Sequence, residues 1–113
     1  MSVSFEEIGQ VAATFQAESG VTVGQVCKIT ANGKVGACSA GENFCGVAIS
    51  KKGGYGAVAV RGFVTLNYTG DTAPTVGYCT LAADGKGGVA VPKSGGREYL
   101  VVGVENGTVT VLL

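Results

Sequence analysis

The side chains of this sequence that could do chemistry include four cysteines and eight acids, but no histidine. A nucleophilic serine or cysteine needs a base beside it, and that base is most often histidine. A Ser-His or Cys-His arrangement is therefore impossible. Two carboxylates could still act as general acid and base, but several acids fall near the N-terminus or at expected turns, namely Glu6, Glu7, Asp84 and Glu105. We expect no catalytic residues and no enzymatic activity.

The cysteines are spaced too widely for a zinc site. A single turn delivers two zinc ligands when they are about two to four residues apart, whereas this chain places its cysteines singly, at Cys27, Cys38, Cys45 and Cys79. Disulfides are rare in the cytoplasm, where we expect the chain to be made. The sequence thus predicts buried thiols that act as small hydrophobic side chains, with no metal site and no cofactor.

The charge pattern argues against nucleic-acid and membrane partners. The formal net charge is zero, and the only adjacent basic residues are Lys51 and Lys52, whereas nucleic-acid binding needs clustered positive charge. No apolar stretch approaches the roughly 20 residues that span a bilayer. A secretory signal begins with basic residues, but acidic Glu6 and Glu7 stand here. We expect synthesis in the cytoplasm.

The elements that must position these side chains are short strands. Twenty glycines separate valine-rich runs, which indicates many tight turns. Strands are expected at 11–17, 26–31, 44–50, 57–66, 76–81, 99–105 and 108–112, with a short one near 88–91. The dipeptides Asn32-Gly33, Asp84-Gly85 and Asn106-Gly107 fit type I′ hairpin turns. The fold class predicted is all-β, a small closed β-barrel or sandwich of about seven to nine strands with hairpin connections.

The sequence also contains a weak internal duplication. Residues 22–34 reappear, with one deletion, as residues 75–86, and residues 45–49 have a looser counterpart in 102–105. The alternative is that valine-rich strands and Asn/Asp-Gly turns look alike by chance. We expect one β-barrel domain at 11–113, preceded by an N-terminal arm at 1–10. The arm's helical spacing of apolar residues competes with a strand pattern that begins at Val11, and we favour the strand.

Several short segments carry a family resemblance: 13–17, 23–28, 39–48, 60–64, 102–105 and 109–113. From about residue 11 onward their order resembles that of the small β-barrel capsid decoration, or cement, proteins of tailed bacteriophages and prophages. The resemblance implies a structural protein that binds the outer surface of the mature head and stabilises contacts between major capsid subunits. Such proteins are commonly homotrimers located on the virion. The family has no catalytic residues to carry over.

Within this reading, the arm is the expected contact with the capsid. We hypothesise that Phe5, Ile8 and Val11 contact the partner, since an arm could add a strand to an exposed sheet edge. One alternative is a phage tail or baseplate β-module that binds a host glycan through exposed tyrosines. Another is a miniature enzyme with Cys79 or Cys45 as its nucleophile.

Overall fold

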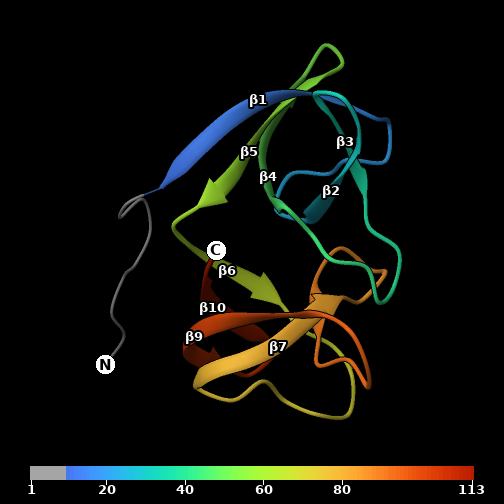
Figure 1. Cartoon of the computed structure of the whole chain (residues 1–113). Coiled ribbons are helices and arrows are strands. Elements are labelled where there is room, and N and C mark those ends of the chain that lie inside the picture. Colours follow the sequence, from blue (N-terminus) through green and yellow to red (C-terminus); the bar gives the residue numbers. More distant parts are fainter. Residues whose placement is uncertain (1–9) are drawn as a thin grey trace.

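A computed structural model describes residues 10–113, which form ten strands and no helix (Figure 1). The all-β fold predicted from the sequence is confirmed, and none of the described residues lies in a helix that could cross a membrane. The strands are β1 (Val11–Ala17), β2 (Val26–Ala31), β3 (Lys34–Ala37), β4 (Gly46–Lys52), β5 (Tyr55–Arg61), β6 (Phe63–Asn67), β7 (Gly77–Ala83), β8 (Val89–Ala90), β9 (Arg97–Glu105) and β10 (Thr108–Leu112).

Several strands differ from the sequence-based expectation. The strand expected at 44–50 is β4, Gly46–Lys52, because Phe44 and Cys45 belong to the loop before it. The run expected as one strand at 57–66 is divided into β5 and β6 at Gly62, whose φ is 107°. A side chain has no room there, because the backbone of Gln10 lies against the position of a Cβ atom. The strand β3 was not predicted, and it follows the expected two-residue turn at Asn32-Gly33. The turn at Asp84-Gly85 is longer than expected, since β8 begins only at Val89.

The ten strands form two halves with the same topology. Strands β1–β5 make a closed barrel in the order β1-β3-β2-β4-β5, and strands β6–β10 make a sheet in the order β6-β10-β9-β7-β8. Each strand of the second half therefore has the same neighbours as the strand numbered five lower in the first half, so that β6 corresponds to β1 and β10 to β5. The first half is closed by parallel pairing of β1 with β3, whereas an isolated parallel bridge between Tyr68 and Val89 stands at the corresponding place in the second.

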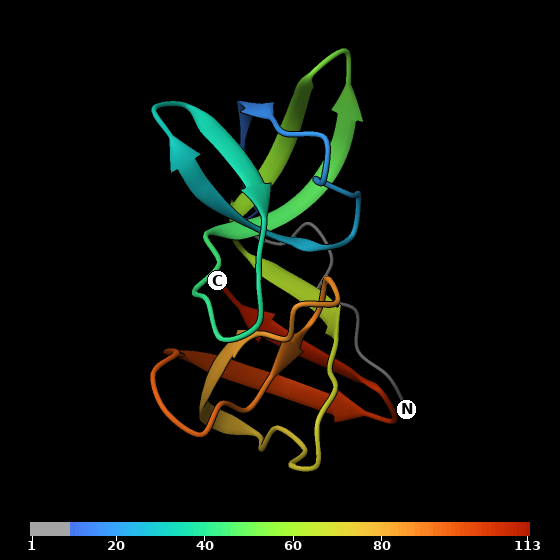
Figure 2. The same cartoon turned by 90° about the vertical axis from the view of Figure 1, so that its right-hand side faces the viewer.

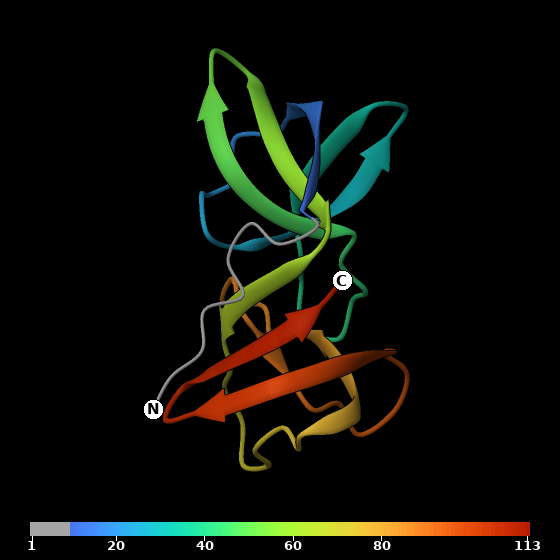
Figure 3. The ribbon, with the colours of Figure 1, turned by 90° about the vertical axis from the view of Figure 1, so that its left-hand side faces the viewer.

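The register shows that the duplication is structural. Each residue pair between β9 and β10 lies 53 positions after a pair between β4 and β5, as in Lys52–Tyr55 and Glu105–Thr108. Both hairpins also carry a bulge at the equivalent position, between β4 residues 48 and 50 and between β9 residues 101 and 103. Figure 3 shows both hairpins, β4–β5 at the top and β9–β10 at the bottom. The predicted internal duplication is thus confirmed.

The match of residues 45–49 to 102–105 is out of register, however. Cys27 pairs with Gly46, and its counterpart Cys79 pairs with Tyr99. The structure therefore places Tyr99, not Gly103, at the position that corresponds to Gly46. The alignment of Cys27 with Cys79, which the longer repeated string gives, agrees with the strand pairing.

The molecule has two hydrophobic cores, one within the first half and one shared by both halves. The closed barrel surrounds its own small core, formed by Val21, Cys27, Val35, Ala48 and Val58. The second core takes residues from both halves: Val26, Phe44, Val47 and Ala59 from the first, and Val64, Leu66, Leu81, Ala83, Val89, Tyr99, Val101, Val109 and Val111 from the second. The second sheet is therefore completed by apolar side chains that the first half supplies.

Gly46 provides a test of the close packing between β4 and β5. An added Cβ atom would collide with the carbonyl oxygen of Ala59 and the side chain of Val58, so Gly46→Ala is expected to destabilise the protein by about 1–3 kcal/mol. Gly103→Ala is the matched control, because nothing lies within 4 Å of its added Cβ atom. Urea unfolding measures both. Equal effects of the two substitutions would contradict the packing described here.

Candidate functional site

Three of the four cysteines and the closer of the two ion pairs among the described residues lie on or against one loop. This crossing loop, residues 38–45 between β3 and β4, leaves the first barrel, runs along the second half and returns (Figure 2). It joins the end of β7 through two backbone hydrogen bonds: Gly41 N–H donates to the Ala83 carbonyl at 2.8 Å, and Ala83 N–H donates to the Glu42 carbonyl at 2.9 Å. The loop is therefore a fixed connection between the halves.

Phe44 anchors the loop in the second core. Its ring stacks on that of Tyr99, with centroids 5.0 Å apart and planes within 7°, and only 4% of Phe44 is exposed. The Tyr99 hydroxyl donates to the Phe44 carbonyl at 3.4 Å, and burial raises the pKa of Tyr99. The Arg97 guanidinium lies 5.3 Å from the centroid of the same ring. Such a stacked pair is worth about 0.5–1.5 kcal/mol beyond its buried area.

A charged clamp holds the middle of the loop against β2. Lys28 Nζ lies 2.7 Å from both carboxylate oxygens of Glu42, and the Ser39 N–H donates to the same carboxylate at 2.6 Å. The hydrogen bond from Lys28 lowers the pKa of Glu42, and the same contact raises the pKa of Lys28. Both side chains are partly exposed, so the pair orients the loop more than it stabilises the fold.

Three of the four cysteines gather at the two ends of the loop. Cys27 is buried in β2, whereas Cys38 and Cys45 are partly exposed. Burial raises the pKa of Cys38 to about 11. The thiols of Cys27 and Cys45 interact, which lowers the pKa of Cys45 to about 7 and raises that of Cys27. The more exposed Cys45 is thus the thiol of this pair that ionises first. In residues 10–113, no three His, Cys, Asp or Glu side chains are placed to hold a metal.

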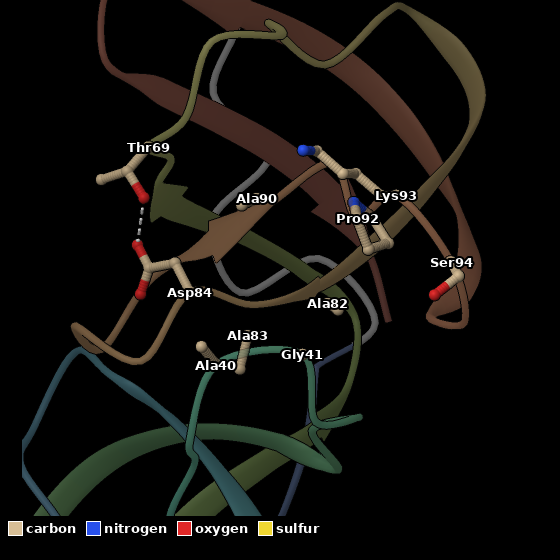
Figure 4. A pocket seen from close by; sticks show the side chains of 10 residues that line it. All are labelled: Ala40, Gly41, Thr69, Ala82, Ala83, Asp84, Ala90, Pro92, Lys93 and Ser94. Atoms are coloured by element: carbon tan, nitrogen blue, oxygen red, sulfur yellow. Dashed lines mark hydrogen bonds between the residues drawn. The ribbon is translucent and has the colours of Figure 1, made fainter.

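A hollow of about 390 Å³ lies beside the loop (Figure 4). Ala40 and Gly41 of the crossing loop form one side, and the rest comes from the second half: Thr69, Ala82, Ala83, Asp84, Ala90, Pro92, Lys93 and Ser94. The Asp84 carboxylate already accepts three hydrogen bonds, from Thr69 Oγ1 at 2.9 Å and from the backbone N–H groups of Lys86 and Gly88 at 2.6 and 3.1 Å. This carboxylate therefore shapes the β7–β8 turn.

The residues predicted to contact a partner are placed only in part. Val11 is the first residue of β1, where it pairs with Arg61 and is 53% exposed. Phe5 and Ile8 lie outside the described residues. The four tyrosines considered for a glycan surface are divided. Tyr55 and Tyr78 are exposed on different halves, Tyr68 is partly buried against the core, and Tyr99 is buried.

Two exposed valines lie in the same three-residue string, once in each half. Val23 precedes β2 within Thr-Val-Gly and is 55% exposed, and Val76 precedes β7 within the same tripeptide and is 70% exposed. The glycine that follows each valine has a positive φ, 86° at Gly24 and 100° at Gly77. Both glycines therefore have a φ that favours glycine, although Gly24 lies in the turn before β2 and Gly77 is the first residue of β7, where it pairs with Val101. We call Val23 and Val76 the repeat valines; the repeated string was visible in the sequence, but their exposure was not.

Comparisons with known proteins do not assign the chain to a family. No family model matches it, and no curated protein is significantly similar to it.

The charged clamp predicts a pH-dependent anchoring of the crossing loop. A lowered folded-state pKa means that ionised Glu42 stabilises the loop above its ordinary pKa of about 4.3, and that this contribution is lost as pH falls through the folded-state pKa. In Glu42→Gln, hydrogen exchange at the Gly41 and Ala83 amides should be faster than in wild type at pH 7. The difference should shrink once Glu42 is protonated in the wild type.

The exposed carboxylate of Glu105, at the β9–β10 hairpin, supplies the control. Glu105→Gln should leave the exchange of the Gly41 and Ala83 amides unchanged at both pH values. A Glu42→Gln protein that exchanges like wild type at pH 7 would show that the clamp does not hold the loop.

Proposed function

We propose that the protein is a structural phage capsid decoration protein. It binds the outer surface of the mature head of a tailed phage or prophage and stabilises contacts between major capsid subunits. The observation that carries this proposal is the pair of repeat valines, because each half presents an exposed valine in the same Thr-Val-Gly string, followed by a glycine of positive φ. The segment resemblance to cement proteins supports the same conclusion.

A duplicated contact suits a partner that is itself repeated. Val23 and Val76 belong to two halves that share a core and therefore form one body. A partner that offers one matching groove would use only one of them, whereas a lattice of identical subunits offers the groove many times. Once one valine is bound, binding of the second is intramolecular, which raises the overall affinity without any new type of contact.

The energetic role follows from linkage. A protein that binds the expanded head, but not its separated subunits, stabilises the assembled lattice by RT ln(1 + [L]/Kd), about 2.7 kcal/mol at a hundredfold excess over Kd. A homotrimer, the state that the resemblance implies, would multiply the effect by avidity. The proposed partners are the major capsid protein and further copies of this chain, and the proposed location is the outer capsid surface of the virion.

The alternative function is a tail or baseplate module that binds a host glycan. Two exposed rings favour it, Tyr55 at 55% and Tyr78 at 71%, because sugars pack on exposed aromatic faces. The two functions differ in what they require. The decoration protein binds assembled heads and no free sugar, whereas the glycan module binds a sugar saturably without heads.

The repeat valines can be tested by head binding. Val23→Asp and Val76→Asp each remove an apolar contact worth about 1.5–3 kcal/mol, so each should weaken binding to undecorated heads about 10- to 100-fold. Ile29→Asp is the control, because Ile29 is exposed but not duplicated. Ile29 is 52% exposed, whereas Leu81, the residue at the corresponding position of the second half, is buried. Co-sedimentation with purified heads measures the affinities. Equal losses in all three variants, or saturable glycan binding by the wild type, would contradict the proposal.

The arm gives a second test. Removal of residues 1–9 keeps Gln10, whose backbone packs against Gly62, so the truncated protein should retain the thermal unfolding of the full chain. If Phe5 and Ile8 contact the capsid, the truncated protein should bind heads at least tenfold more weakly. Undiminished head binding by the folded, truncated protein would reject the predicted role of the arm.

A further inference from the structure

Two cysteines of the first half lie side by side at the start of β4. Cys27 in β2 pairs in register with Gly46, the residue that follows Cys45. The Cys45 N–H donates to the Cys27 carbonyl at 2.8 Å, and the Cys27 thiol donates to the Gly46 carbonyl at 3.7 Å. The two residues are thus tied together by backbone pairing.

Their side chains also contact the same core. Successive residues of a regular strand point to opposite faces, so a regular strand would turn Cys45 away from Cys27. Cys45, however, precedes β4 and lies outside the ladder. Its side chain packs against the core of the closed barrel, to which Cys27 belongs. The two thiols are close enough to interact directly.

We propose that Cys27 and Cys45 form an oxidant-sensitive dithiol, which a small-molecule disulfide such as oxidised glutathione converts to a disulfide that fastens β2 to β4. This inference goes beyond the proposed function and does not depend on it. The site is accessible from one side only, since Cys45 is partly exposed and Cys27 is 1% exposed. Cys45 is therefore the residue that the oxidant meets.

The reaction balances as two successive thiol–disulfide exchanges. The Cys45 thiolate attacks one sulfur of oxidised glutathione, forms a mixed disulfide and releases one glutathione thiolate. The mixed disulfide removes the Cys45 thiolate, whose contact is the largest cause of the raised pKa of Cys27. Cys27 then gives its proton to the released glutathione thiolate, and its sulfur attacks the Cys45 sulfur and expels the second glutathione thiolate, which takes a proton from water. The protein loses two hydrogens, and the oxidant is reduced to two molecules of glutathione. The lowered pKa of Cys45 suits the first step, because the thiolate is the attacking form.

The duplication supplies an internal control. Cys79 is the counterpart of Cys27, but the residue 53 positions after Cys45 is Glu98. The second half therefore has a thiol without a thiol neighbour at the equivalent place. Cys38, whose pKa is raised by burial, should remain protonated and unreactive at neutral pH. Only one pair of cysteines is expected to react.

The test treats the full chain with oxidised glutathione, blocks the remaining thiols with N-ethylmaleimide and maps the products by mass spectrometry. We expect a Cys27–Cys45 disulfide with Cys38 and Cys79 blocked, a rate of Cys45 attack that rises with pH through about 7, and a Tm raised by several degrees that a reductant restores. Cys79→Ser should react like wild type, and Cys45→Ser should not form the disulfide.

Since Cys27 is buried, Cys27→Ala could impair folding, and Cys45→Ser is therefore the primary variant. Where Cys27→Ala folds, it should stop at the mixed disulfide on Cys45, because no second thiol resolves it. A lasting mixed disulfide on Cys45 of the wild type would overturn the proposal. A bond between any other two cysteines, or four thiols that remain free, would also overturn it.

Discussion

The contact between Phe44 and Tyr99 is the constraint on which the two-part architecture depends. The second sheet curls around a core that its own strands do not fill, and Phe44 enters that core from a loop of the first half. The strands on either side of the loop belong to the closed barrel, so the loop can reach Tyr99 only by leaving the barrel and returning. Its hydrogen bonds to Ala83 and its ion pair with Lys28 hold it along that path. Two similar halves thereby become one molecule with a shared interior.

Much of the strand content could be predicted from the sequence, because alternation and Asn-Gly turns are local signals. The turns at Asn32-Gly33 and Asn106-Gly107 each connect paired strands as expected. The break at Gly62 could not be predicted in this way, since its cause is the backbone of Gln10, which is distant in sequence. Phe44 fits the start of a strand pattern, yet it lies in the crossing loop because its partner comes from β9.

The candidate site was less predictable than the fold. The expectation of buried thiols holds for Cys27, but Cys45 is partly exposed and has a lowered pKa. Spacing along the chain does not show that these two residues meet, since their proximity arises from the pairing of β2 with β4. The repeated Thr-Val-Gly string was visible, whereas the outward position of its valines depends on how each turn enters its strand.

The division of the cores has a consequence for synthesis of the chain. Every residue of the closed barrel's core precedes Gly62, and β5, its last strand, ends at Arg61. The ribosome therefore releases a complete set of barrel strands before it makes β6, and chains generally fold from the N-terminal part as they emerge. Phe44 is then already present when the later strands appear, so the first half can serve as the template on which the second assembles.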